Sequence, residues 1–121
     1  MQQETEQLTI TAEEANQMRK EHSDRIAKAK ALKNLYLNED FKKVFLEGYL
    51  KDEAVRLVGL LGEPNFNGSE KKDLYRAEIR ECMIGIARFN EYCRQVFNMA
   101  QQSESMIKSL NEAEIVDAPV Q

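Results

Sequence analysis

The sequence is poor in residues that interrupt or cross-link a chain: its 121 residues include two prolines, two cysteines, five glycines and no tryptophan. Glycine and proline come together in one segment only, residues 62–68, so the frequent turns of an all-β fold are missing. No apolar run has the length that crosses a bilayer, and the longest candidate, residues 54–61, is far too short. These absences leave an all-α protein as the expected class.

Cysteine and histidine are too few and too scattered for the usual disulfides and metal sites. Cys82 and Cys93 are eleven residues apart on one expected helix. They would lie about 16 Å apart along its axis, whereas a disulfide joins Cα atoms within about 7 Å. We expect two reduced thiols that fill core space, with a cross-subunit disulfide as the alternative. The one histidine, His22, lies on an apolar stripe beside Met18 and Ile26, where a packed imidazole is expected rather than a metal ligand.

Catalytic and targeting motifs are missing as well. The sequence has no G-x-S-x-G, no phosphate-binding P-loop and no G-x-G-x-x-G, and no stretch reads convincingly as a strand. We therefore expect a non-enzymatic protein without a cofactor or a metal. The net charge of −4 gives no global attraction to nucleic acid or to an anionic membrane, and the first ten residues do not resemble a secretory signal. The expected location is the cytoplasm, without a membrane partner.

The first helix is expected from residue 11 to about residue 37. Thr11 followed by Glu14 is the pattern of a capping box, in which each side chain caps the backbone N–H of the other residue. Apolar residues then recur every three or four positions, which is the period of a helix. The stripe is rich in small side chains, which favours a partner helix at close distance. It consists of Ala15, Met18, His22, Ile26, Ala29, Leu32 and Tyr36.

Two short helices are expected next, in the most apolar part of the chain, residues 35–61. Asn38 can cap the first of them, and Gly48 is expected to bend or end it because glycine costs about 1 kcal/mol inside a helix. The second is expected over residues 52–61, with Gly62 as its stop signal. We expect the core of the fold to be centred on these two helices.

One unbroken helical pattern covers residues 69 to about 113. Its apolar positions alternate in steps of four and three, as in the seam of a coiled coil, and Ser69 is placed to cap its start. Gly85 lies in its middle and is expected to mark the close approach of a neighbouring backbone. The helix would span about 65 Å, against roughly 38 Å for the first helix. We expect an all-α helical hairpin of two long helices, with two short helices between them and an extended C-terminal helix.

The half of the long helix beyond residue 96 has no obvious partner in its own chain, so we expect it to form an oligomer or partner interface. The residues of this expected interface are Ala100, Ser103, Met106, Ile107 and Leu110. The expected organisation is a flexible acidic arm over residues 1–10, a single helical domain over 11–113 and a flexible tail over 114–121. The chain is expected to form a homo-oligomer.

A local excess of positive charge marks the first helix. Its members are Arg19, Lys20, Arg25, Lys28, Lys30 and Lys33. They could bind the phosphates of a nucleic acid, form a solvated face, or pair with an acidic partner or the acidic ends of the chain. Because no aromatic residues for base stacking are interleaved with them, we favour the solvated or partner-pairing face over nucleic acid.

Four short patterns and Leu57 follow one another in the central region: D-F-K at residues 40–42, G-Y at 48–49, D-E-A at 52–54 and L-L at 60–61. In these patterns the sequence resembles a group of short all-helical proteins of tailed bacteriophages. The group shows a similar pattern between an N-terminal helix and a long C-terminal one. The resemblance covers residues 35–61 directly and the general layout of the rest, and it implies no catalytic residues.

The resemblance implies a non-enzymatic virion structural or assembly protein, associated with the head or the connector. Such a protein would act by self-association and by docking on other virion proteins, first in the host cytoplasm and then in the virion. The alternative is a small phage-encoded regulator or inhibitor that binds a host factor or nucleic acid through the basic residues of the first helix.

Overall fold

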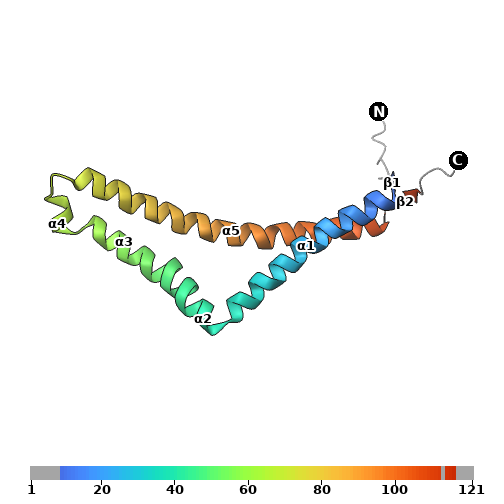
Figure 1. Ribbon diagram of the computed structural model, residues 1–121, viewed down its shortest axis with the longest axis horizontal. Coiled ribbons are helices and arrows are strands. Elements are labelled where there is room, and N and C mark those ends of the chain that lie inside the picture. Colours follow the sequence, from blue (N-terminus) through green and yellow to red (C-terminus); the bar gives the residue numbers. More distant parts are fainter. Residues whose placement is uncertain (1–8, 113, 117–121) are drawn as a thin grey trace, which may run out of the picture. The chain divides into compact units, whose positions relative to one another are not determined.

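The structure is a computed structural model that describes residues 9–112 and 114–116, and these residues form an all-α fold with one small pair of strands (Figure 1). The expected class is therefore confirmed. The elements, in chain order, are strand β1 (Thr9–Thr11), helices α1 (Ala12–Leu37) and α2 (Glu39–Phe41), π-helix η1 (Lys42–Glu53), helices α3 (Ala54–Leu61), α4 (Pro64–Asn67) and α5 (Lys72–Glu112), and strand β2 (Glu114–Val116).

The chain divides into two compact units, each of which is described by itself. Unit 1 contains the described residues up to Lys30 and those from Val96 onward. Unit 2 is the segment Ala31–Gln95. Both long helices contribute to both units. The arrangement of the two long helices as one hairpin stays a prediction.

Side chains cap the helices where the sequence indicates. The Glu14 backbone N–H donates to Thr11 Oγ1 at 3.1 Å, and the Phe41 backbone N–H donates to Asn38 Oδ1 at 2.9 Å. Ser69 Oγ accepts a 3.1 Å hydrogen bond from the backbone N–H two residues further on, just before α5. The first two acceptors satisfy N–H groups that have no partner inside their own helix, so the expected caps at Thr11 and Asn38 are confirmed. The Ser69 bond closes a turn before the helix, because α5 begins at Lys72 and not at the expected residue 69.

In unit 1 the first part of α1 lies beside the last part of α5 (Figure 1). Ile10, Ala15 and Leu110 form a buried cluster, with Met18 packed against it. Beside this cluster β1 pairs with β2 in parallel, with Ile10 opposite Ile115. The expectation of no strand is wrong here, because a three-residue strand is too short to show an alternating pattern and its partner lies about a hundred residues away.

The expected arm and tail are only partly within the described residues. Ile10, which belongs to the expected arm, is 8% exposed and is part of β1. Residues 1–8 of the arm, the domain end at residue 113 and residues 117–121 of the tail lie outside the described residues.

In unit 2 helices α2, η1 and α3 follow one another without a break from residue 39 to residue 61. The expectation that Gly48 ends a helix is therefore wrong. The apolar residues Phe41, Phe45, Tyr49 and Ala54 follow one another in steps of four, four and five, which is wider than the α-helical period. A π-helix matches this spacing better, because each hydrogen bond spans five residues and each turn holds more of them.

The core of unit 2 joins α3 to the first part of α5. Leu57 is buried together with Ile79 and Ile86, at 3%, 7% and 7% exposure. Tyr49, Leu50, Ala54, Leu60, Leu61 and Met83 pack around these three. In Figure 1, α3 accordingly runs alongside the first part of α5. Gly62 caps the C-terminus of α3, as the sequence indicates.

Candidate interaction surfaces

The residues expected to form an interface on the last part of α5 are largely buried within the chain itself. Ala100, Ser103 and Leu110 are 6%, 1% and 0% exposed. Ile107 is half-buried, and Met106 is 40% exposed. The inference that this half of α5 has no partner in its own chain is wrong. Whether Met106 or Ile107 takes part in an interface stays a prediction.

The first part of α1 covers this part of α5. If α1 and residues 41–61 both packed on the first half of α5, the second half would be bare. In the structure the start of α1 packs on the end of α5 within unit 1. The first part of α5 packs against η1 and α3 within unit 2. Residues 41–61 pack on the first part of α5 as expected, and the start of α1 is therefore free to cover the last part.

His22 and Ser103 form a buried polar contact between α1 and α5. His22 Nδ1 and Ser103 Oγ are 3.0 Å apart and share a hydrogen bond. His22 is 9% exposed and Ser103 is 1% exposed. The expectation of a packed, hydrogen-bonded imidazole is confirmed. The pair resembles a nucleophile and a base in its chemistry, but a serine buried this deeply offers a substrate no access, so its role is structural.

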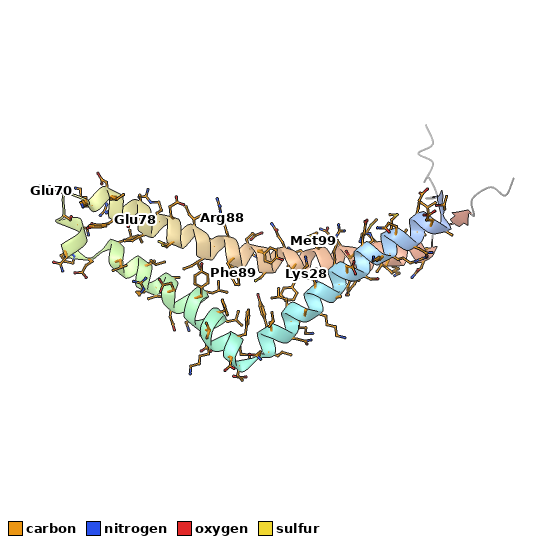
Figure 2. The ribbon with its side chains drawn as sticks, in the orientation of Figure 1. Lys28, Glu70, Glu78, Arg88, Phe89 and Met99 are labelled. Carbon is orange, nitrogen blue, oxygen red and sulfur yellow. The ribbon has the colours of Figure 1, made fainter. Side chains whose placement is uncertain are left out.

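Aromatic rings form a continuous row in unit 2. Phe41 stacks on Tyr36 and on Phe45, with ring centroids 5.8 and 5.1 Å apart. Phe89 on α5 then contacts Phe45 and Tyr49, at 6.2 and 5.8 Å. Figure 2 shows Phe89 on the side of α5 that faces η1. The row ties η1 to α5 and fixes which side of the π-helix faces inward.

Tyr36 lies at one end of the aromatic row, and the pKa of its phenol is strongly raised. Burial, which is the largest cause, together with a hydrogen bond and a charge interaction with Cys93, raises its pKa to about 12. Each of these effects favours the neutral phenol over the phenolate. Tyr36 is therefore expected to stay protonated at any physiological pH.

Gly85 contacts a side chain and not a backbone. A Cβ built on Gly85 would lie 3.7 Å from the Tyr49 hydroxyl oxygen, and no other heavy atom of a neighbouring element in the described residues lies within 4 Å of it. The expectation that Gly85 marks a close backbone approach is therefore wrong. The close approach occurs at Gly48, where a Cβ would lie 3.0 Å from the Lys43 carbonyl oxygen inside η1.

The basic residues of α1 do not gather into one patch. Arg19 is half-buried, whereas Lys20, Arg25, Lys28, Lys30 and Lys33 are exposed. At 3.6 residues per turn, Lys30 and Lys33 lie about 60° apart around the helix, whereas Lys28 lies about 140° or more away from both. Within residues 9–112 and 114–116, none of them is in an ion pair; the pairs there are Lys42–Glu39, Arg56–Glu53 and Arg94–Glu91. Their pairing with an acidic partner stays a prediction.

The two cysteines have different surroundings. Both are free thiols, Cys93 is buried and Cys82 is exposed. The expectation of a core thiol is thus confirmed for Cys93 and wrong for Cys82. Cys82 borders an open hollow of about 220 Å³ between α3 and α5, together with Arg56, Leu57, Leu60, Tyr75, Glu78 and Ile79. A second, more apolar hollow of about 320 Å³ is lined by Leu50, Ala54, Met83, Ile86, Ala87 and Asn90.

The outward side of α3 is apolar and open. Val55 is 68% exposed and Val58 is 54% exposed, on the side away from the buried Leu57. Gly59 has no neighbouring heavy atom within 4 Å of a built Cβ, and Gly62 follows one turn later. We call these four residues, Val55, Val58, Gly59 and Gly62, the α3 outer face. They are spaced i, i+3, i+4 and i+7, so they lie along one side of the helix.

Sequence reasoning missed the α3 outer face because it treated the whole segment as core. A signal was present: α3 has one charged residue among eight, Arg56. Its guanidinium is hydrogen-bonded to Glu53, with Arg56 Nε donating to Glu53 Oε2 at 2.9 Å, and it holds the pKa of that carboxyl below its ordinary value. A helix that is apolar on all sides must be buried on all sides or must leave one apolar side open.

The described part of the chain has neither a cluster of metal ligands nor a membrane-spanning helix. No group of three or more potential metal-ligating side chains occurs among residues 9–112 and 114–116. None of the helices described is both long and apolar enough to span a membrane. The fold and its surfaces thus define an all-α protein with open apolar faces. Comparison with protein-family models, with curated proteins and with solved structures finds no match to this chain.

Proposed function

We propose that this chain is a non-enzymatic protein of a tailed bacteriophage that acts by self-association and by docking on other virion proteins. Within that class we propose a structural or assembly component of the head or connector. The observation that carries the proposal is the exposed apolar surface of unit 2, above all the α3 outer face, since contiguous apolar surface of this kind is typical of protein contacts. The resemblance of residues 35–61 to short helical phage proteins is its second support.

Self-association is tested by light scattering of the purified full chain over a range of micromolar concentrations. We expect a mass that rises with concentration to a defined oligomer. A chain that stays monomeric and helical throughout the range would overturn this part of the proposal.

The place in the virion is tested by mass spectrometry of purified particles of the phage that encodes the chain. We expect the chain in the particle or in its assembly precursors. Its absence from both, together with its presence early in infected cells, would instead favour the regulator described next.

The second candidate is a small phage-encoded regulator or inhibitor that binds a host factor or nucleic acid through α1. The observation that favours it is the set of exposed basic side chains on α1 that make no ion pair within the described residues. Its test is a mobility shift of DNA or RNA at two salt concentrations, with the triple variant Lys28→Glu, Lys30→Glu and Lys33→Glu as comparison. A salt-sensitive shift that the variant loses would support the regulator, because phosphate contacts weaken with salt.

A further inference from the structure

Asn67 is the one asparagine in this sequence that is followed by a glycine. In an Asn–Gly pair the glycine nitrogen can attack the side-chain carbonyl carbon of the asparagine, because no glycine side chain hinders the approach. The bond that forms between Gly68 N and Asn67 Cγ closes a five-membered succinimide ring. Asn67 Nδ2 then leaves as ammonia, with the proton that Gly68 gives up. Asn67 therefore has the sequence context in which spontaneous deamidation is fastest.

Water completes the reaction by opening the ring at one of its two carbonyl carbons. Opening at the side-chain carbon converts Asn67 to an aspartate. Opening at the main-chain carbon gives an isoaspartate, whose backbone runs through the former side chain. Either route consumes one water and releases one ammonia, so the conversion needs no enzyme and no oxidant.

The folded chain holds the Asn67 amide at both of its polar atoms. Asn67 Nδ2 donates to the Leu61 carbonyl oxygen at 3.0 Å. Asn67 Oδ1 accepts from both Nε and Nη2 of Arg76, at 3.1 and 2.6 Å. These contacts join helix α4, which connects α3 to α5 (Figure 1), to the last residue of α3 and to the first part of α5. While they are in place, the amide cannot turn toward the Gly68 nitrogen.

The attacking nitrogen is held as well. The Gly68 backbone N–H donates to the Pro64 carbonyl oxygen at 2.9 Å, and the Asn67 backbone N–H donates to the Glu63 carbonyl oxygen at 3.1 Å. Attack requires that Gly68 loses the proton that it donates here, so α4 must open before the ring can close. Because α4 has only four residues, such an opening is local and does not require the rest of unit 2 to unfold.

We propose that Asn67 is a deamidation site that becomes reactive when α4 opens locally, and that Arg76 is the residue that keeps α4 closed. The carboxylate that replaces the amide still binds Arg76, now with a full charge. It has no N–H group to donate to the Leu61 carbonyl oxygen, so two acceptors face each other. Deamidation therefore releases α4 from the end of α3 and adds one negative charge to unit 2.

The role of Arg76 is tested by ageing the full chain in mildly alkaline buffer and measuring the peptide that contains Asn67 by mass spectrometry, which separates the amide from the slightly heavier carboxyl group. Arg76→Ala is expected to speed deamidation of the folded chain about fivefold, which corresponds to about 1 kcal/mol. The matched control is Arg80→Ala, an exposed arginine one turn further along α5, which should react like the wild type. In urea all three chains should react at one common, faster rate, because the contacts of α4 are then absent.

Three results would overturn the proposal. A folded Arg76→Ala chain that deamidates at the wild-type rate would remove the role of Arg76. A folded wild type that reacts as fast as the chain in urea would show that the fold does not protect Asn67. If no folded chain reacted over a time in which the chain in urea reacts fully, local opening would not reach the site.

The structural consequence of deamidation is tested by hydrogen exchange of the Asn67→Asp variant. We expect faster exchange of the α4 amides than in the wild type, since the bond to the Leu61 carbonyl oxygen is lost. Asn65→Asp adds the same charge at an exposed position of the same helix and should leave these amides unchanged. Equal exchange in the two variants would contradict the release of α4 from α3.

Discussion

His22 and Ser103 show what a single buried polar contact does in this molecule. The two side chains are far apart in sequence and meet at 3.0 Å between α1 and α5. An apolar seam of small residues allows one helix to slide along another at little cost. A buried hydrogen bond does not, because a shift by one turn would leave both polar groups without partners. The pair therefore fixes the register of unit 1.

Ser103→Ala is expected to lower the free energy of unfolding by about 1–3 kcal/mol, since it leaves the buried His22 nitrogen without its partner. Denaturant unfolding followed by circular dichroism measures this change. The control is Ser105→Ala, on the same helix at an exposed position, where we expect a change near zero. Equal effects of the two variants would contradict a register role for the pair.

Tyr36 makes the stability of unit 2 depend on pH in the alkaline range. Its pKa is raised from 10.0 to about 12 in the folded chain, so folding favours the protonated phenol. The stability from this preference is fully present below pH 10 and is lost as the pH rises toward 12. Tyr36→Phe keeps the ring but does not ionise, so its free energy of unfolding should fall less than that of the wild type over this range.

This expectation is checked by unfolding titrations at several pH values between 9 and 12, which bracket the ordinary and shifted pKa of Tyr36. Tyr92→Phe is the control, because Tyr92 is 56% exposed. It should follow the wild-type pH dependence. If the free energy of unfolding depended on pH in the same way for the Tyr36 variant and the wild type, the Tyr36 phenol would not contribute to this pH dependence.

At the scale of the element, the π-helix η1 is the feature that departs most from ordinary helical structure. It extends over 12 residues, whereas π-helical segments are mostly single turns inside α-helices. Aromatic packing supports it: Phe41, Phe45 and Tyr49 are brought to one side and contact Phe89 through the ring row.

Gly48 fits this conformation because its position leaves little room for a side chain. A Cβ would lie 3.0 Å from the Lys43 carbonyl oxygen, a backbone atom that cannot move without disturbing the helix. Gly48→Ala is therefore expected to destabilise the chain by about 1 kcal/mol or more. An alanine in an open helix would instead gain up to about 1 kcal/mol over glycine.

Gly85→Ala is the matched control for this prediction. Its Cβ would meet the Tyr49 hydroxyl oxygen at 3.7 Å, an ordinary van der Waals distance, so the usual gain of helix propensity should appear. Thermal unfolding of the two variants under the same conditions measures the difference. A stabilising Gly48→Ala would mean that this segment relaxes readily to an α-helix.

At the scale of the whole molecule, the division into two compact units predicts two distinct responses to core truncation. Leu110 is fully buried in unit 1, and Leu57 is 3% exposed in unit 2. Truncation of either to alanine is expected to cost about 2–5 kcal/mol. We expect each loss to appear first in the amides of its own unit, since local stability follows local packing.

Native-state hydrogen exchange measures this response. Leu110→Ala should speed exchange in the described residues up to 30 and from 96 onward, and Leu57→Ala should do so between residues 31 and 95. Met106→Ala, on the exposed side of α5, serves as the control and should leave both units unchanged. A uniform response to both truncations would show that the chain unfolds as one cooperative body.

The sequence by itself determined the local structure of this protein. The caps at Thr11 and Asn38, the end of α3 at Gly62 and the all-α class all depend on residues close together in the chain, so their signals are complete in the sequence. Short-range backbone hydrogen bonds and helical periodicity carry that information.

Only the tertiary structure decided which apolar positions are covered. Ala100, Ser103 and Leu110 have the same helical spacing whether α1 or a second copy packs on them, and Val55 and Val58 look like core residues until the partner of α3 is known. The three-residue strands and the register between His22 and Ser103 likewise depend on segments distant in sequence. Burial is a property of two surfaces in contact, and the periodicity of one helix describes only one of them.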